Sequence, residues 1–189
     1  MKTLKTLVAI GIVSFIMTGC GSSNNNLNTA KLKNIVDTSG ENIKIASKIP
    51  YAKNSMVSYA IQTECNIQSQ LSEYIKEYSE DNGLKVIIDD APSPLDMVLN
   101  VTIDKAVSTG NAFLGHKKYI VITGKLLKNG KLLSTVHAAR RSSGGFMGGF
   151  KGSCSVLGRA AKALGKDIGK WLSNPVDNVY IGNTNLISR

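Results

Sequence analysis

The residues that could carry chemistry in this chain are two histidines, three cysteines, an adjacent pair of aspartates and a glycine-rich run. His116 and His137 stand at no metal-ligand or nucleophile spacing from another such residue. Asp89 and Asp90 lie in a proline-rich turn, where adjacent carboxylates cap the local backbone and do not form a separated acid and base. The run 142–150 lacks the Gly-Lys-Ser/Thr ending of a phosphate-binding loop. We therefore expect no catalytic residue, no metal site and no cofactor, in a protein that is not an enzyme.

The N-terminal segment accounts for the first cysteine. Lys2 and Lys5 precede an apolar stretch, 7–17, which has the length of an export signal and is too short for a membrane-spanning helix. The residues Met-Thr-Gly-Cys at 17–20 resemble the lipobox that the lipoprotein signal peptidase reads. The resemblance implies that residues 1–19 are removed and that acyl chains, palmitate among them, anchor Cys20 to the membrane. The alternative is an uncleaved N-terminal helix. Gly21 after the cysteine is similar to the outer-membrane sorting pattern, so we expect a lipoprotein of the outer membrane with its domain in the periplasm.

The two other cysteines, Cys65 and Cys154, are the thiols that remain once Cys20 is acylated. An exported chain meets an oxidising compartment, and the two cysteines lie at the N-terminal ends of the two helices expected to share one face of the sheet. We therefore expect one disulfide between them, which the chain-entropy model values at about 4–5 kcal/mol for a loop this long. The alternative is two buried free thiols that pack as small apolar groups.

Charge is distributed unevenly along the sequence. From Cys20 to Asp104 there are 7 basic and 11 acidic residues, net −4, whereas Lys105 to Arg189 holds 14 basic and 2 acidic residues, net +12. The second part attracts anions. In an exported protein these would be lipopolysaccharide phosphates, peptidoglycan carboxylates or an acidic protein, and nucleic acid is not expected as a partner. The alternative is a basic surface that serves solubility alone.

Hydrophobic spacing predicts a short tether, 20–30, followed by a single domain, 31–189. The domain alternates helical and strand-like runs, with an Asn-Gly hairpin turn at 129–130. We expect an α+β two-layer sandwich whose sheet is mostly antiparallel, a meander over 97–142, with two amphipathic helices on one face. The expected helices are 61–79 and 157–172, and the expected strands are 43–46, 84–88, 97–104, 119–127, 132–141 and 179–181.

These elements, taken in order after the lipobox at Cys20, resemble a group of envelope lipoproteins. The resemblance rests on the first helix with the following Gly83-Leu84-Lys85-Val86-Ile87, the strand from Asp96 to Asp104, the Asn129-Gly130 hairpin and the closing helix. They are similar to the domains of the curli-secretion channel lipoprotein and of the lipoprotein activator of penicillin-binding proteins, over about residues 43–173. The resemblance implies the α+β fold and an envelope location, and it transfers no functional residue. Long alternating insertions for membrane-spanning hairpins are missing from the sequence, which argues against a channel.

Two glycine-rich loops form the candidate binding site. The first, 108–115, and the second, 142–152, follow strands of the meander that point the same way, so both should emerge at one end of the sheet. An apolar tip in a basic collar suits insertion into a partner pocket or an anionic lipid interface. The alternative is that the loops bury each other over the sheet edge. The expected tip residues are Phe113, Leu114, Phe146, Met147 and Phe150, and the collar residues are Lys117, Lys118, Arg140, Arg141 and Lys151.

The expected function is therefore a non-enzymatic, lipid-anchored envelope lipoprotein that binds or scaffolds an envelope partner protein. The alternative is a module that binds lipopolysaccharide or peptidoglycan through the same collar. The membrane itself is a partner through the acyl chains on Cys20. The sequence does not determine the oligomeric state.

Overall fold

The computed structural model describes residues 36–111, 115–142 and 152–187. The chain divides into two compact units, Met1–Leu32 and Lys33–Arg189, and every described residue belongs to the second. Within the described ranges, no helix is long and apolar enough to cross a membrane.

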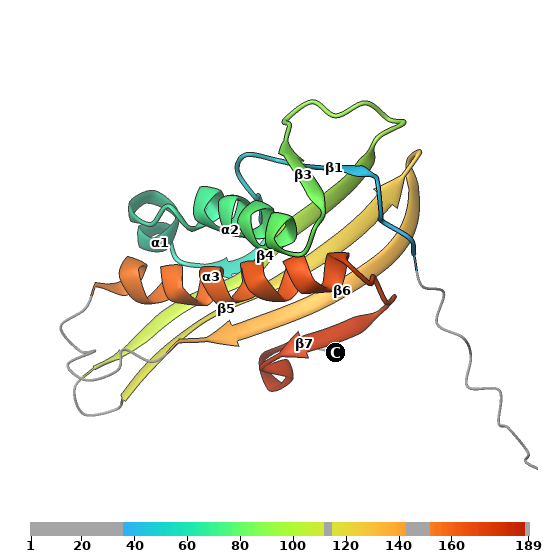
Figure 1. The fold of residues 1–189 in the computed structure, drawn as a ribbon. Coiled ribbons are helices and arrows are strands. Elements are labelled where there is room, and N and C mark those ends of the chain that lie inside the picture. Colours follow the sequence, from blue (N-terminus) through green and yellow to red (C-terminus); the bar gives the residue numbers. More distant parts are fainter. Residues whose placement is uncertain (1–35, 112–114, 143–151, 188–189) are drawn as a thin grey trace, which may run out of the picture. The chain divides into compact units, whose positions relative to one another are not determined.

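The described residues of the second unit form one sheet, two main helices and two shorter helical turns (Figure 1). The strands are β1 (Asn42–Ile45), β2 (Tyr51–Val57), β3 (Lys85–Ile88), β4 (Met97–Asn111), β5 (Gly115–Lys128), β6 (Lys131–Arg141) and β7 (Val179–Gly182). The helices are α1 (Tyr59–Glu64), α2 (Ile67–Asp81), α3 (Ser153–Leu172) and the 3-10 turn η2 (Thr184–Leu186).

The sheet is mixed, which corrects the expectation of a mostly antiparallel one. Its strand order is β3-β1-β4-β5-β6-β7, and β2 pairs with β4 beside β1. The pairs β4–β5 and β5–β6 are antiparallel, whereas β1–β3, β1–β4, β2–β4 and β6–β7 are parallel. Parallel neighbours need a long crossover, and α2 and α3 provide it before β3 and β7. Side-chain alternation reveals a strand but not the direction of its neighbour, so the sequence pattern missed this.

The three central strands form the expected meander, and they are longer than predicted. Asn129 and Gly130 both have positive φ, 52° and 71°, as a two-residue hairpin turn requires. Strand β4 continues to Asn111 and β5 begins at Gly115, with these two residues paired, so most of the expected loop 108–115 is a hairpin extension.

Two further elements differ from the expectation. The helix expected over 61–79 is two helices, which end and begin on either side of Cys65 and Asn66. Strand β2 was not expected because its residues do not alternate between apolar and polar and it follows Pro50. Pro50 lies just outside the strand, where it needs no donor, and its carbonyl accepts a hydrogen bond from Ile103 N at 2.9 Å.

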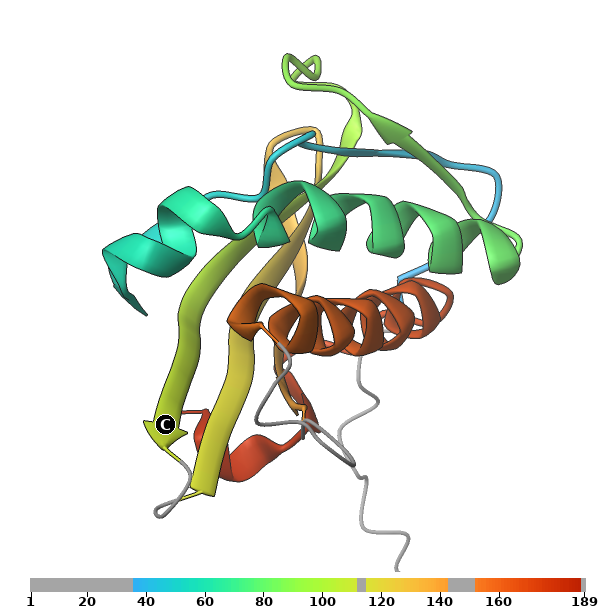
Figure 2. The ribbon, with the colours of Figure 1, turned by 90° about the vertical axis from the view of Figure 1, so that its left-hand side faces the viewer.

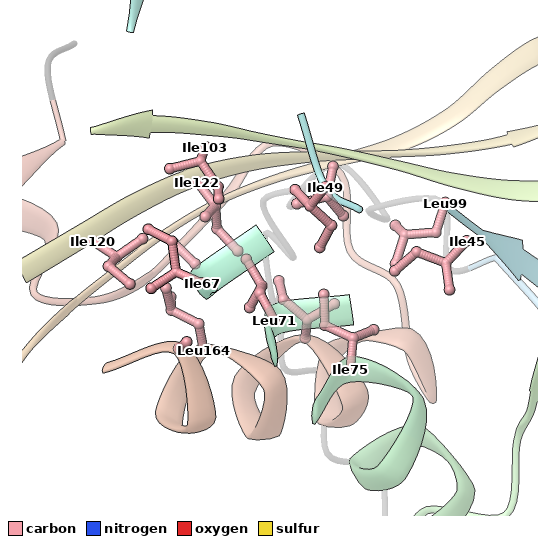
Figure 3. Packing of buried hydrophobic residues seen from close by; sticks show 14 of the residues in the cluster. Ile45, Ile49, Ile67, Leu71, Ile75, Leu99, Ile103, Ile120, Ile122 and Leu164 are labelled. Atoms are coloured by element: carbon pink, nitrogen blue, oxygen red, sulfur yellow. The ribbon is translucent and has the colours of Figure 1, made fainter. Parts of the chain in front are cut away.

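Both main helices lie side by side on one face of the sheet (Figures 1 and 2). The apolar side of β4 and β5 meets their apolar faces, and Figure 3 shows Ile103, Leu99 and Ile122 packed towards Leu71 and Ile75 of α2. These side chains are at most 1% exposed. Each fully buried Leu or Ile contributes about 1.5–3 kcal/mol of transfer free energy, so this face accounts for most of the stabilising burial.

The two helices approach each other closely at two glycines of α3. A Cβ on Gly165 would lie 2.4 Å from Tyr74 Cβ, and one on Gly169 would lie 2.7 Å from the carbonyl carbon of Tyr78. Real Cβ atoms do not come this near to a backbone, so only glycine permits the packing of α3 against α2.

Candidate functional site

All five predicted tip residues lie outside the described part of the chain. Cys20, Phe113, Leu114, Phe146, Met147, Phe150 and Lys151 lie outside the described residues. The structure does place the strands that lead into the two loops. Asn111 pairs with Gly115, and β6 ends at Arg141 opposite Tyr119, so both loops leave the same end of the sheet. The β4–β5 hairpin extends four residues further than β6, about 13 Å at 3.3 Å per residue. We call the end of the sheet from which both loops emerge the hairpin end of the sheet.

The described collar residues divide into two pairs. Lys117 and Arg141 are exposed at the hairpin end. Lys118 is only 6% exposed, because alternation along β5 turns it towards the helix-covered face. Arg140 donates two hydrogen bonds of 2.6 Å to the carboxylate of Asp167 on α3, which raises its pKa. Arg140 is therefore paired and Lys118 is buried, so neither is a free exposed cation here; their part in partner binding stays a prediction.

A row of four cations follows one side of α3. Arg159, Lys162, Lys166 and Lys170 are exposed and repeat at intervals of three and four residues, one side of a helix. We call them the cation stripe. The described ranges include every Asp and Glu of the sequence, and none of these carboxylates forms a salt bridge with the stripe. None of the four is among the candidate binding residues predicted from the sequence, although their helical spacing was the signal that could have identified them.

The expected disulfide joins the helical layer near the start of the stripe. Cys65 and Cys154 are bonded, and they link the α1–α2 junction to the first turn of α3. Ser153 Oγ also lies 2.8 Å from Ser108 Oγ of β4. These contacts fix the N-terminal end of α3, and with it Arg159, towards the hairpin end of the sheet.

A hollow lies between α2 and α3 beside this disulfide. We call it the α2–α3 hollow; its volume is about 260 Å³ and it is lined by Gln70, Tyr74, Cys154, Ser155, Gly158, Arg159 and Lys162. Lys162 Nζ lies 5.7 Å and 5.9 Å from the ring centres of Tyr74 and Tyr78. A hydrogen bond to Tyr78 and the nearby Glu77 carboxylate raise the pKa of Lys162. The hollow thus presents an unpaired guanidinium and a lysine held in its charged form.

The open face of the sheet carries a row of polar side chains that sequence reasoning did not find. A bulge at Asp104 turns its carboxylate towards β5, where Thr123 donates to it at 2.7 Å. Thr123 Oγ1 lies 3.1 Å from His137 Nδ1 on β6, and the His137 ring stacks on Tyr180 of β7 at 5.0 Å. We call these four residues the polar row. Outward polar positions on successive strands were the available signal, but their register was unknown.

The hydrogen bonds of the polar row determine whether Nδ1 of His137 carries a proton. Thr123 has one hydroxyl proton and gives it to Asp104, so His137 Nδ1 must carry the proton that joins it to Thr123. In this arrangement His137 does not act as a base towards the hydroxyl.

Asp89 and Asp90 cap the turn that they were expected to occupy. Asp90 accepts hydrogen bonds of 2.7 Å from both the backbone N and the hydroxyl of Ser47, and Asp89 accepts from Ala91 N and pairs with Lys44 at 3.1 Å. These bonds, the backbone ones first, lower the pKa of both carboxyls. Within the described ranges, no group of three or more His, Cys, Asp or Glu residues is placed to hold a metal ion.

Comparison of the sequence with models of protein families and with curated proteins found no match. Among solved structures, the chain is distantly similar to a PelC dodecamer from Paraburkholderia phytofirmans, with 14% identity and a TM-score of 0.44 over 67% of this chain and 87% of that one. It is also similar to a minor lipoprotein from Acinetobacter baumannii, at 12% identity and a TM-score of 0.42, over 72% of this chain and 97% of that chain. A lipoprotein from Neisseria meningitidis has 14% identity and a TM-score of 0.42, over 69% and 99%. The likeness to the curli-secretion and penicillin-binding-protein-activating lipoproteins remains a prediction.

Proposed function

We propose that the protein is a non-enzymatic lipoprotein, anchored through Cys20 to the outer membrane, whose periplasmic domain binds an anionic polymer of the cell envelope through the cation stripe. The observation that carries the proposal is the stripe itself. Helix α3 holds four basic residues and one acidic residue, and that acid, Asp167, is already paired with Arg140.

The acidic charge of the neighbouring helix α2 should confine a bound anionic polymer to the stripe on α3. Helix α2 has Glu73, Glu77, Glu80 and Asp81 against Lys76 alone, net −3, while α3 is net +3. A polymer carrying phosphates or carboxylates would be attracted to α3 and repelled from α2, so it should lie along one helix. Lipopolysaccharide and peptidoglycan both present such groups in the envelope.

Paired charge reversals of the full-length protein test the stripe. Lys166→Glu with Lys170→Glu should lower retention on the polymer about tenfold or more, because two attractive charges become repulsive. Lys125→Glu with Lys131→Glu, two exposed lysines of the sheet, makes the same change in net charge and is the control. Co-sedimentation with isolated peptidoglycan and capture on lipopolysaccharide separate the two polymers. Equal losses in the two double variants would refute the proposal, since net charge alone would then account for binding.

The first expectation was binding to a partner protein. That expectation depends mainly on tip residues outside the described ranges. Crosslinking in cells tests it directly. If Phe113→Ser and Phe146→Ser each abolish a protein crosslink while the stripe variants keep it, the partner is a protein bound at the hairpin end and the polymer proposal is wrong.

The anchor is tested by Cys20→Ala. The variant should remain an uncleaved precursor, lose palmitate labelling and leave the outer-membrane fraction. Labelling and fractionation that match the native protein would contradict the assignment of Cys20.

The non-enzymatic proposal is supported by the state of the polar row. In this arrangement His137 Nδ1 donates to Thr123 and so does not serve as its base, and the polar row lies on the face of the sheet opposite the helices and the cation stripe (Figure 1). Thr123→Val should therefore leave binding to the polymer unchanged. A hydrolytic activity of the purified protein that Thr123→Val removes would overturn this part of the proposal.

A further inference from the structure

We infer that the α2–α3 hollow is a binding site for a phosphate group, presented to Arg159 and Lys162 at the start of the cation stripe. This inference rests on the proposed function and deepens it, because it names phosphate as the anion that is recognised.

The size of the hollow limits what it can hold. Its volume of about 260 Å³ lies below the range of roughly 300–1,000 Å³ that is typical of pockets for drug-sized ligands. It therefore suits one small charged group at the end or side of a larger molecule. The rest of that molecule would extend along α3, where Lys166 and Lys170 continue the stripe.

The charges of the hollow select an anion. Arg159 has no carboxylate within salt-bridge distance among the described residues, so its guanidinium is free to form two parallel hydrogen bonds to one anionic group. Lys162 adds an ammonium that the neighbouring tyrosines hold at the wall of the hollow. The position of the Lys162 ammonium depends on these rings and not on a carboxylate partner. Its charge is therefore only partly neutralised, by Glu77.

A phosphate monoester uses these donors more fully than a carboxylate does. It carries between one and two negative charges at neutral pH and offers three acceptor oxygens, whereas a carboxylate has one charge and two oxygens. Ser155, exposed at the wall, adds a hydroxyl donor, and the first turn of α3 has no acidic residue that would repel an anion. The disulfide holds this turn against the α1–α2 junction, so the backbone that carries Ser155 is held in place beside the hollow.

Titration calorimetry of the full-length protein in detergent, with inorganic phosphate as the probe and acetate as the comparison, tests the inference. Phosphate should bind more tightly than acetate. Arg159→Gln should weaken phosphate binding about tenfold or more, as expected when one charged hydrogen-bonding partner worth about 1.5–3 kcal/mol is lost. Lys125→Gln, which removes an equal charge from the sheet, outside both the hollow and the stripe, is the matched control and should change the affinity much less.

A second variant separates binding from folding. Glu77→Gln removes the carboxylate that partly neutralises Lys162, so phosphate should bind more tightly to it, and a purely structural role of these residues would not produce a gain. Binding to vesicles of phosphatidylcholine with phosphatidic acid, compared with binding of inorganic phosphate, distinguishes a lipid headgroup from free phosphate as the source. Binding of both should depend on Arg159 if the hollow is the site.

The outcomes distinguish the inference from the proposed function. If phosphate does not bind, or Arg159→Gln and Lys125→Gln weaken its binding equally, the hollow is not a phosphate site, although the stripe can still retain the polymer. If phosphate binds as expected but the Lys166 and Lys170 reversals leave polymer retention unchanged, the hollow stands and the proposed function fails.

Discussion

The two faces of the sheet are stabilised in different ways. On the helix-covered face, apolar side chains such as Leu99 and Ile103 pack against α2 and α3, and glycines at the helix contact allow a very close approach. On the open face, the polar row crosses four strands through hydrogen bonds and a ring contact. Close packing therefore stabilises the helix-covered face, whereas the register of the strands, which brings hydrogen-bonding groups together, stabilises the open face. Substitutions on the two faces should destabilise the domain for different reasons.

The open face is partly covered by the end of the described chain. After β7, Asn183 N donates to Ala139 O, and Lys105 Nζ lies 3.4 Å from Leu186 O. This segment reaches from β6 to β4, and Val121 and Ala139 are at most 3% exposed. The polar row lies beside it, and Asp104, Thr123 and His137 are half-buried, whereas Tyr180 is 38% exposed.

The largest effect should come from removing the disulfide that closes the helix-covered face. Replacing Cys65 and Cys154 together by alanine opens a loop of 89 residues, which the chain-entropy model values at about 4–5 kcal/mol. Denaturant unfolding with and without reductant measures the loss in the native protein. The double variant is the control, because reductant should not change it further. Two alkylatable thiols in protein isolated under oxidising conditions would contradict the pairing.

The next effect concerns the close contact of the helices. Gly165→Ala places a methyl group 2.4 Å from Tyr74 Cβ and should destabilise the domain by about 1–3 kcal/mol, the usual cost of overpacking. Gly158→Ala is the matched control. Its Cβ would meet only the end of the Gln70 side chain, at 3.1 Å, so the gain in helix propensity, about 1 kcal/mol, should make it neutral or stabilising. Thermal midpoints that fall by the same amount in both would show that the contact is not tight.

The open face should respond to loss of a hydrogen-bonding group of the same shape. Thr123→Val keeps the volume but leaves Asp104 and His137 without their shared partner, which should cost about 1–3 kcal/mol. Thr109→Val, at an exposed threonine of β4, controls for the change of residue type. If urea midpoints show no difference between the two variants, the polar row does not stabilise the sheet.

The smallest effect should appear in acid, at the turn that joins β3 to β4. The folded pKa values of Asp89 and Asp90 are lowered, so their contribution to stability is present above the unfolded pKa, near 3.9, and is lost as pH falls through the folded values. Asp90→Ala should therefore remove part of the decline in stability below about pH 4, without changing its course near neutrality. An identical pH profile in the variant would mean that the Ser47 contacts do not form in solution.

Local sequence patterns were sufficient for the elements that depend on neighbouring residues. The Asn129-Gly130 turn, the meander of β4, β5 and β6, and the amphipathic α3 all follow from side-chain spacing and turn chemistry. The pairing of Cys65 with Cys154 also followed from the sequence, because an oxidising compartment leaves two thiols with one partner each.

Tertiary structure decided whatever depends on partners far apart in the chain. The parallel pairing of β1, β2, β3 and β7 is set by how the crossover helices pack, and alternation along one strand carries no information about the direction of the next. The same holds for the candidate sites. Arg140 is withdrawn from the collar by Asp167, 27 residues away, while Thr123 and His137 meet only because β5 and β6 pair in one register. Sequence could identify these residues as charged or polar, but the distance between two side chains on different elements is fixed only when the elements pack together.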